Sequence, residues 1–459
     1  MMRLSLLVTL LLASLVHAEP ITVGFAEADI TPEIGKKPVY LAGFGQRRKA
    51  TGVHDPLMAR AVVLGHKDDT IAIVSVDVVG LFLPTVERIR AELPGFRYVL
   101  VSATHNHEGP DTMGLWGANP FASGVDPDYL AKVEAGCVSA VKRAHAHRKP
   151  AVARIGSAKA PELIRDARLP EIKHDELVAI SFRDPKTDAP LGTLVQWNNH
   201  PETLSSSNTE VTADFVGYAV RRLRTSQKCP VVYLTGTVGG LMTTLRLKVT
   251  DAAGKELADG SFAKAERYGT LLADVADKAI ASSVPAEMAP FTVRTRAILL
   301  PVDNNLYRLA WTLGTLKRSL YRWDGDPTPK EFVTTTDVAK PVAVKTEVGY
   351  LRLGDLEIAV IPGEIYPELV LDRVQNPVDP GADFPMAPIE PAIYPALTAK
   401  HRMLIGLGND ELGYIIPKRQ WDDKPPYCYG LKKAQYGEEN SLGPETAPIV
   451  CKVFRDLVK

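Results

Sequence analysis

The sequence predicts an α/β fold, and two features of the chain carry this prediction. Short apolar runs rich in Val and Ile recur along it, and several stretches between them have apolar residues at three- and four-residue steps. Short apolar runs are typical of buried strands, whereas the longer spacing is typical of amphipathic helices. Strands that alternate with helices favour an α/β architecture. No linker rich in Pro, Gly and Ser divides the chain, which indicates one large domain.

The individual elements follow from these patterns. Strands are expected, in chain order, at residues 61–64, 71–76, 98–101, 194–197, 231–234, 358–361 and 403–407. Helices are expected at residues 85–93, 127–145, 213–225 and 263–282. Residues 303–340 are the least regular stretch, and we interpret them as an insertion or a lid over the main domain.

The composition is that of an ordinary globular protein and excludes some functional classes. Of the 459 residues, 45% are apolar and 24% are charged, which argues against extended disorder. Lys and Arg together number 54, and Asp and Glu together also number 54. Nucleic-acid binders usually carry a basic excess, so we expect no nucleic-acid partner. The sequence carries no signal of a particular oligomeric state.

The N-terminus has the three parts of a secretory signal peptide. Arg3 makes a short positive region, residues 4–16 are mostly apolar, and Val16-His17-Ala18 is a small-x-small cleavage site. We therefore predict that residues 1–18 are removed and that residues 19–459 form the mature domain, which is secreted or periplasmic. The apolar run is shorter than the ~20 residues of a transmembrane helix, and no second apolar stretch is long enough to span a membrane.

Four cysteines remain in the mature chain, at positions 137, 229, 428 and 451. Export permits disulfides, but four cysteines in a chain of this length are not a disulfide scaffold. A bond between Cys428 and Cys451 would close a C-terminal loop, and buried, unpaired thiols are the alternative. No Cys-x-x-Cys pair occurs, so a thiolate zinc site has no support.

Side chains of the types that bind metals follow five of the expected strands. They are, in chain order, Asp77, His105 with His107, His200, Glu364 and Tyr414. Open sheets build their sites just beyond the carboxyl ends of their strands. In an extended segment, His105 and His107 present both imidazoles on one face, with Cα atoms about 7 Å apart. Zinc hydrolases commonly use three protein ligands and a water, and His105, His200 and Glu364 would supply such a set.

Several segments of the mature chain resemble the neutral/alkaline non-lysosomal ceramidases, a family of secreted zinc amidases. The most specific is Thr104-His105-Asn106-His107-Glu108-Gly109-Pro110, and the order and spacing of the others add to it. The other matching segments are residues 24–32, 41–45, 52–61, 74–77, 213–218, 363–364 and 409–414, followed by Tyr436, Ser441, residues 443–444 and residues 446–447. The resemblance implies a large α/β domain with mixed sheets flanked by helices.

The resemblance also implies a role for individual residues. The positions that match the zinc ligands of the family are His105, His200, Glu364 and Tyr414. His107 matches a second histidine beside the metal, which handles protons or substrate. Tyr436 matches a tyrosine that faces the developing oxyanion, and Arg168 matches an arginine on the substrate side.

Three departures from the family pattern make the metal centre better supported than ceramide as the substrate. Family members tend to carry Gly-Asp-x-Ser-Pro after a central strand, whereas this chain has Val238-Gly239-Gly240-Leu241-Met242-Thr243 there. Glu108 stands where the family usually has Ser. The C-terminal β-sandwich domain of the family has no counterpart in residues 19–459.

These residue types support hydrolysis of an N-acyl amide in a lipid-like or other small substrate. A bound Zn²⁺ lowers the pKa of water from about 15.7 to about 7 and polarises a carbonyl. Tyr436 would donate a hydrogen bond to the oxyanion, His107 would carry a proton to the leaving amine, and Asp77 or Asp214 would orient a ligand imidazole.

Two other functions remain open on the same scaffold. One is a zinc esterase or lactonase, which the altered 238–243 segment favours. The other is a secreted binding protein without catalysis. A serine hydrolase is not supported, because the chain has no Gly-x-Ser-x-Gly.

Overall fold

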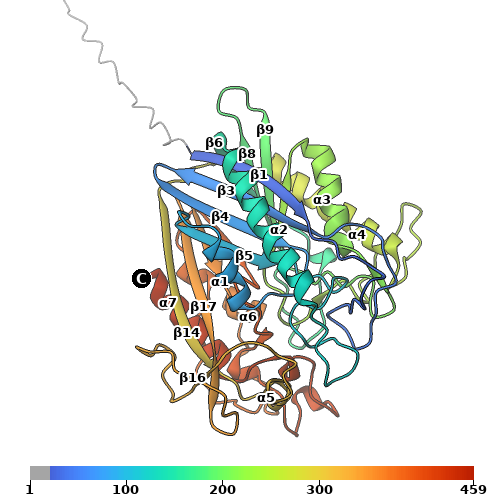
Figure 1. Ribbon diagram of the computed structural model, residues 1–459, viewed down its shortest axis with the longest axis vertical. Helices are drawn as coiled ribbons and strands as arrows, with labels where there is room; N and C mark the ends of the chain where they lie inside the picture. Colours follow the sequence, from blue (N-terminus) through green and yellow to red (C-terminus); the bar gives the residue numbers. More distant parts are fainter. Residues whose placement is uncertain (1–20) are drawn as a thin grey trace, which may run out of the picture.

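The computed structural model describes residues 21–459 and shows a mixed α/β fold built on two stacked sheets (Figure 1). The predicted signal peptide, residues 1–18, lies outside the described residues. All of the strands and helices expected from the sequence are present, with their ends shifted by a few residues. Among the described residues, no helix is both long enough and apolar enough to cross a bilayer.

Within residues 21–459 the larger sheet has nine strands, in the order β11-β9-β8-β6-β1-β3-β4-β5, with β13 also paired to β6. Pairs β4–β5 and β9–β11 are parallel and the other pairs are antiparallel, so the sheet is mixed. The strands are β1 (Ile21–Asp29), β3 (Met58–His66), β4 (Asp69–Val76), β5 (Tyr98–Ala103), β6 (Lys149–Lys159), β8 (Glu176–Arg183), β9 (Pro190–Trp197), β11 (Val231–Thr235) and β13 (Val284–Ala286).

The second sheet of the described chain has six strands, in the order β16-β15-β17-β18-β20, with β14 also paired to β17. Its β18–β20 pair is parallel. The strands are β14 (Phe291–Pro301), β15 (Leu320–Arg322), β16 (Thr334–Thr335), β17 (Val342–Leu353), β18 (Leu356–Val360) and β20 (His401–Ile405). Three short pairs complete the strands: β2 (Gly52–Val53) with β10 (Glu210–Val211), β7 (Arg165–Asp166) with β12 (Met242–Thr243), and β19 (Glu364–Ile365) with β21 (Tyr414–Ile415).

Helices cover the outer faces of both sheets. In Figure 1, α2 crosses the face of the larger sheet, α3 and α4 lie beside β9, and α7 lies outside β14 and β17. The helices are α1 (Leu83–Ala91), α2 (Pro127–Ala146), α3 (Asp214–Gln227), α4 (Phe262–Ala281), α5 (Asn305–Thr312), α6 (Pro367–Leu371) and α7 (Thr446–Val458). Short 3-10 turns lie at Pro161–Leu163, Tyr394–Ala396, Lys418–Gln420, Cys428–Gly430 and Glu438–Asn440.

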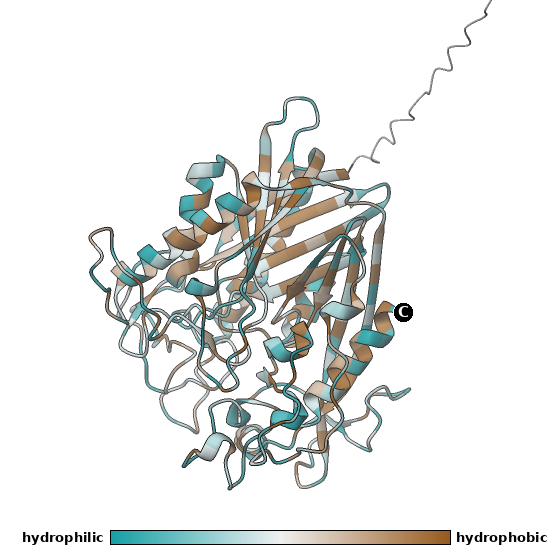
Figure 2. Ribbon diagram, turned by 180° about the vertical axis from the view of Figure 1, so that it is seen from behind, coloured by the Kyte–Doolittle hydropathy of each residue, from teal (hydrophilic) through white to brown (hydrophobic). Residues whose placement is uncertain are grey.

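The side chains of each strand alternate between two cores, and this alternation produces the layers. In β3, Val62 and Leu64 pack into a core shared with the second sheet, whereas Ala61 and Val63 pack toward α2. The same period of two puts Ile358 of β18 between the sheets and its neighbour Ala359 against the α7 side. The strands are therefore buried on both faces, and Figure 2 shows hydrophobic residues concentrated along them. The result is a stack of helices, sheet, sheet and helices.

Two open expectations are decided by the structure. The four cysteines, all within the described residues, are buried and unpaired, so Cys428 and Cys451 do not form a disulfide. Residues 303–340 are more regular than the sequence suggested, because they contain α5, the edge strand β16 and its neighbour β15. Each of these elements is only two to eight residues long, which is too short for either periodicity to emerge from the sequence.

Candidate metal centre

The loops that follow β5, β9, β18 and β20 meet at one edge of the two stacked sheets. Two backbone hydrogen bonds tie the loops of one sheet to the other: Gly406 N–H donates to Thr235 O at 3.0 Å, and Asn409 N–H donates to Val101 O at 2.7 Å. Carboxyl ends of parallel strands lie at the same edge of a sheet, which is where sites form in open sheets. The stacking of two such edges brings residues about 300 positions apart into one site.

His105 leaves β5 in a conformation that the sequence pattern did not predict. Its φ is +66°, in the left-handed region that non-glycine residues seldom adopt, so the His-x-His segment is not extended. The expected alternation of an extended strand is therefore wrong here. The imidazoles of His105 and His107 still lie close, with ring centroids 4.8 Å apart, because the turn brings them together.

The imidazoles of His105 and His200 are oriented by backbone carbonyls. The Nδ1 atom of His105 lies 2.7 Å from Val79 O, and Nδ1 of His200 lies 2.7 Å from Met242 O. A carbonyl can only accept, so each Nδ1 carries the proton and each Nε2 keeps a lone pair for a metal.

The expected carboxylate support for these imidazoles is therefore wrong. Asp77 forms an ion pair with Arg60, with oxygen–nitrogen distances of 2.8 Å. Asp214 accepts the backbone N–H of Leu204 at 3.1 Å.

Glu364 and Tyr414 face the two Nε2 atoms from neighbouring positions on β19 and β21, where they are paired in register. Glu364 Oε2 lies 2.9 Å from His200 Nε2 and 3.3 Å from His105 Nε2, and Tyr414 Oη lies 3.4 Å from His200 Nε2. Two ligands of a tetrahedral zinc, each about 2.0–2.1 Å from the ion, lie about 3.3 Å apart. The spacing of these side chains therefore fits one shared metal ion.

His107 belongs to the same cluster and offers a second possible ligand set. Ligand nitrogens of His105, His107 and His200 all lie within 4.8 Å of one another. Neither ring nitrogen of His107 has a hydrogen-bond partner among the described residues, and its Nδ1 lies 3.6 Å from Glu202 Oε2. The shorter distances to Glu364 favour the set His105, His200 and Glu364, with His107 beside it. Gly43, at φ +91°, permits this packing, because a Cβ there would lie 2.2 Å from His107 Cγ.

Burial and the charges of neighbouring side chains shift the pKa values of Glu364, His107 and Glu202. Burial alone would raise the pKa of Glu364, but His105 and His200, when protonated, lower it through their charges and hydrogen bonds. Burial, followed by the charges of His105 and His200, lowers the pKa of His107 well below its usual value. Burial also raises the pKa of Glu202. Buried charges are normally paired or coordinate metals, and this donor set suits a cation.

Tyr436 lies next to the cluster, whereas Arg168 stands behind it. The Tyr436 ring centroid is 5.7 Å from that of Tyr414, and its hydroxyl accepts a hydrogen bond from Asn440 Nδ2 at 2.9 Å. Arg168 is buried and donates to Glu438 at 2.6 and 2.7 Å and to the carbonyl of Tyr436 at 3.0 Å. Arg168 does not line the cavity beside the cluster. Its guanidinium thus contacts the segment that carries Tyr436 and not the space available to a substrate.

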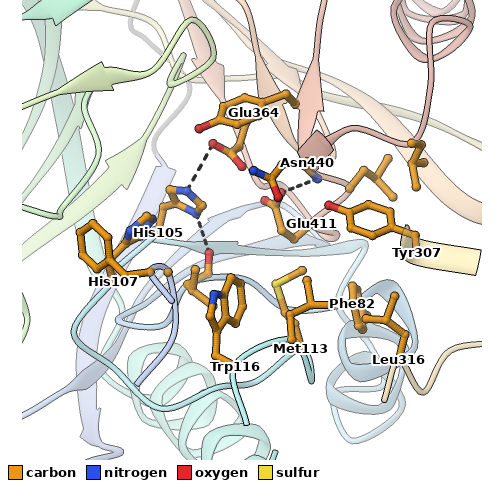
Figure 3. Close-up of a pocket in the computed structure, with 18 of the residues that line it drawn as sticks. Phe82, His105, His107, Met113, Trp116, Tyr307, Leu316, Glu364, Glu411 and Asn440 are labelled. Atoms are coloured by element: carbon orange, nitrogen blue, oxygen red, sulfur yellow. Dashed lines mark hydrogen bonds and ion pairs between the residues drawn. The ribbon is translucent and has the colours of Figure 1, made fainter. Parts of the chain in front are cut away.

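A cavity of about 480 Å³ opens beside the cluster (Figure 3). One end holds His105, His107 and Glu364. In Figure 3, Phe82 and Leu316 lie away from the histidines, and Met113, Trp116 and Trp311 add further apolar side chains to the lining. Tyr307 and Trp311 of α5 and Leu316 come from the 303–340 segment, so this segment contributes part of the cavity wall.

Sequence reasoning missed two carboxyl groups that line this cavity, Glu202 and Glu411. Glu202 lies two residues after His200, and Glu411 lies three residues before Tyr414, within the matching segment 409–414. Their proximity to ligand residues was the available signal.

Glu108 and the 238–243 segment, which depart from the family pattern, have defined contacts in the structure. Glu108 is buried and pairs with Arg48, whose guanidinium also donates to the carbonyls of Ala42 and His107 at 3.0 and 3.1 Å. This ion pair therefore fixes the backbone of the His-x-His segment. In the 238–243 segment, Leu241 lines the cavity and makes that part of its wall apolar.

Comparison with known proteins supports the relationship suggested by these residues. The profile of the family described as neutral/alkaline non-lysosomal ceramidase, N-terminal, matches residues 21–237. No curated protein sequence matches the chain significantly.

Solved structures extend the similarity of fold to nearly the whole chain. A crystal structure of neutral ceramidase from Pseudomonas aeruginosa is similar with a TM-score of 0.70 at 17% identity, covering 96% of this chain and 74% of that one. A structure described as a ceramidase complexed with C2 is similar with a TM-score of 0.68 at 16% identity, covering 96% and 75%. The resemblance predicted from the sequence is confirmed: residues 21–237 match the family model of the N-terminal domain of the neutral/alkaline non-lysosomal ceramidases, and the fold of nearly the whole chain is similar to that of a neutral ceramidase.

Proposed function

We propose that this protein is a secreted, zinc-dependent amidohydrolase that cleaves an N-acyl amide with an apolar chain. The observation that carries the proposal is the convergence of His105, His200, Glu364 and Tyr414, whose ligand atoms have the spacing expected around one zinc ion. These residues would hold the ion. When bound, zinc supplies a Lewis acid that polarises the scissile carbonyl and makes a water acidic enough to act as the nucleophile.

The neighbouring side chains supply the rest of the chemistry. Burial raises the pKa of Tyr436, which keeps its hydroxyl protonated and able to donate a hydrogen bond to the developing oxyanion. One such donor is typically worth ~2.7–4 kcal/mol of transition-state stabilisation. His107 has two uncommitted ring nitrogens beside the ligands, and it would carry the proton from the water to the leaving nitrogen.

The cavity supports an apolar substrate. Aromatic and aliphatic side chains line the end away from the histidines, and a ligand gains ~25 cal/mol for each Å² of apolar surface that it buries there. Because residues 21–237 match a family of ceramidases, an N-acyl lipid is the first candidate for the substrate.

Metal analysis coupled to a substrate panel tests the proposal. The full mature chain, loaded with zinc and dialysed, should hold about one zinc per chain. It should hydrolyse N-acyl amides with long chains, and chelation should abolish turnover. Zinc-free protein that binds apolar amides without cleaving them would instead indicate the non-catalytic binding protein.

A zinc esterase or lactonase is the second candidate, and the apolar 238–243 segment favours it. Leu241, in the segment where the family pattern carries Asp and Ser, makes part of the cavity wall apolar. Matched amide and ester substrates with the same chains separate the two. Esters are intrinsically more reactive than amides. If the enzyme prefers esters by far more than this intrinsic difference, as judged by kcat/KM, and does not cleave the matched amides, it is an esterase and not an amidase.

The secreted or periplasmic location is proposed from the leader sequence. Residues 1–18 have the pattern of a signal peptide, and cleavage after Ala18 would leave Glu19 as the first residue. N-terminal sequencing of the natural protein, together with cell fractionation, tests both. A cytoplasmic protein that begins at Met1 would contradict the proposal.

A further inference from the structure

Glu202 is a buried carboxyl group in the wall of the cavity, and no role described so far requires it. The residue is 3% exposed and lies in the loop after β9, two positions after His200. Its Oε2 atom lies 3.6 Å from Nδ1 of His107, which is itself buried and has no hydrogen-bond partner among the described residues. Burying a carboxyl group costs free energy unless the group is paired, so its neighbours indicate its role.

The 238–243 segment fixes the other oxygen of Glu202. The hydroxyl of Thr243 donates a hydrogen bond to Oε1, and the same hydroxyl oxygen accepts the backbone N–H of Leu245 at 3.0 Å. Because this N–H occupies the Thr243 oxygen as an acceptor, the hydroxyl proton is directed at the carboxyl group. The segment that lacks the Asp and Ser of the family pattern thus holds Glu202 with Oε2 turned toward His107.

His107 is held against Glu202 by its backbone and by the packing of its ring. Its backbone N–H donates to the carbonyl of Pro201, the residue before Glu202, at 3.0 Å. The ring packs on the backbone of Gly43 and on Phe44, whose ring centroid is 5.2 Å away. A separation of 3.6 Å exceeds a hydrogen bond, but catalytic hydrogen bonds are often long until a substrate is bound. With the main chains joined, small side-chain rotations are enough to close this contact.

A carboxylate at this place determines which nitrogen of His107 carries the proton. A neutral imidazole has one N–H, and its other nitrogen is an acceptor. A carboxylate only accepts, so the proton of His107 lies on Nδ1 and Nε2 keeps its lone pair. Nε2 can then take a proton from the attacking water and give the same proton to the leaving nitrogen, which returns His107 to its initial state.

We propose that Glu202 is the positioning residue for His107, and that its Oε2 accepts the Nδ1 proton and so keeps Nε2 available for proton transfer. The inference rests on the proposed amidase function. It also explains why the three histidines have different supports. Backbone carbonyls orient His105 and His200, whereas the charge of a carboxylate stabilises the imidazolium that forms when His107 takes a proton.

Glu202→Gln keeps the shape of the side chain and tests the pair. The new carbonyl oxygen can accept the Thr243 hydroxyl, which turns the amide NH₂ group toward His107, so Nδ1 must accept and the proton moves to Nε2. Nitrogen NMR of zinc-loaded protein with isotope-labelled histidines identifies the protonated nitrogen, and the signals that disappear in His107→Ala are those of His107. We expect a proton on Nδ1 in the wild type and on Nε2 in Glu202→Gln.

Kinetics on one N-acyl amide give a second readout. Glu202→Gln should lower kcat by roughly 10²–10⁴-fold and leave KM almost unchanged, because His107 can no longer accept a proton from water. In a His107→Ala background the same change should have little further effect on kcat, since residues that act as a unit are not additive.

The controls separate positioning from folding and from metal binding. Glu331→Gln makes the same chemical change at an exposed position of the 303–340 segment, and it should leave both readouts as in the wild type. Thermal unfolding and zinc content are measured for every variant. Zinc loss in Glu202→Gln would make Glu202 a metal ligand and overturn its positioning role. If Glu202→Gln does not fold, the protonated nitrogen of His107 in the wild type decides.

The outcomes distinguish this inference from the proposed function. A proton on Nε2 of His107 in the wild type overturns the role of Glu202 and leaves the amidase intact, and so does a proton position or a kcat that Glu202→Gln does not change. Where no amide is cleaved, NMR decides: a proton that moves from Nδ1 to Nε2 in Glu202→Gln supports the pair while the amidase falls. A proton on Nε2 in both proteins then overturns both.

Discussion

At the residue scale, the site is held by the backbone. The carbonyls of Val79 and Met242 orient His105 and His200, and the Nε2 atoms of both point at Glu364. His105 adopts its left-handed φ to reach this position, and strained backbone of this kind persists only where surrounding contacts impose it. The site is thus preorganised for a cation.

Two histidine variants separate metal binding from proton transfer. His105→Ala removes a ligand and should lose both zinc and activity. His107→Ala should keep about one zinc per chain and lose turnover by roughly 10²–10⁴-fold, because it removes a proton carrier. Zinc content by mass spectrometry and kcat on one amide are the measurements. A fully active, metal-free His105→Ala would rule the scheme out, and zinc loss in His107→Ala would assign that residue to the ligands.

Glu368, at the start of α6, makes stability depend on pH. Burial raises the pKa of Glu368 to about 7, above its value of about 4.3 in an unfolded chain. The stability linked to this group is fully present below pH 4.3 and is lost as the pH rises through 7, because only the unfolded chain releases the proton early. Glu368→Gln should therefore gain stability over the wild type at pH 8 by a few kcal/mol, with the difference shrinking toward pH 4.

Urea unfolding of the two proteins at several pH values measures this difference. Gln420 Nε2 donates to Glu368 Oε1 at 3.0 Å, and a glutamine oxygen can accept the same bond, so the exchange preserves the contact. A difference that stays constant between pH 4 and 8 would contradict the raised pKa.

At the element scale, the segment that carries Tyr436 depends on one buried ion pair. Arg168 and Glu438 are both buried, and the guanidinium nitrogens of Arg168 lie 2.6 and 2.7 Å from the carboxylate oxygens of Glu438. Arg168 also donates a hydrogen bond to the carbonyl of Tyr436. The resemblance implied that Arg168 acts on the substrate, but the geometry points to positioning, because the residue reaches the cavity only through Tyr436.

Removing one partner of this pair tests the positioning role. Arg168→Ala leaves Glu438 buried and unpaired and should cost about 3–5 kcal/mol of stability and much of kcat. Arg168→Met with Glu438→Leu should recover most of the stability, since no buried charge remains. Chemical denaturation and kinetics on one amide measure both quantities. A rise in KM alone, with stability and kcat unchanged, would instead place Arg168 at the substrate.

At the scale of the whole molecule, the site depends on how the two sheets stack. Its residues come from both sheets, and the hydrogen bonds Gly406–Thr235 and Asn409–Val101 join their edges. A shift of one sheet over the other would separate His105 and His200 from Glu364. The core between the sheets therefore supports the site as well as the fold.

Truncation of a side chain in that core should lower both the stability of the fold and the zinc affinity of the site. Ile358→Ala removes a fully buried side chain between the sheets and should cost about 2–5 kcal/mol, with a fall in zinc affinity. Met386, which is 89% exposed, supplies the control, because Met386→Ala should change stability by less than about 0.5 kcal/mol. Thermal unfolding and zinc titration are the measurements. Unchanged zinc affinity in a destabilised Ile358→Ala would show that the site does not depend on the stacking.

The pattern of apolar residues along the sequence predicted most of the strands and helices, because it reflects which side chains are buried. Strands such as 71–76 and 231–234 are buried on both faces, and a continuous apolar run records that directly. The convergence of His105, His200 and Glu364 followed from their places after strands. The hydrogen-bond partners of His105 and His200 could not be predicted, since they are backbone carbonyls, which every residue type has. The ion pair of Arg168 with Glu438 could not be predicted from the sequence, because the two residues lie 270 positions apart.

The sequence by itself determined which side chains are available and after which strands they come, since apolar periodicity and residue type are local properties. Only the tertiary structure decided that two sheets stack with their carboxyl ends at one edge, that backbone carbonyls hold the ligand imidazoles, and that Glu411 faces a cavity. Those features arise from contacts between segments far apart in the chain, and such contacts depend on the packing of whole elements.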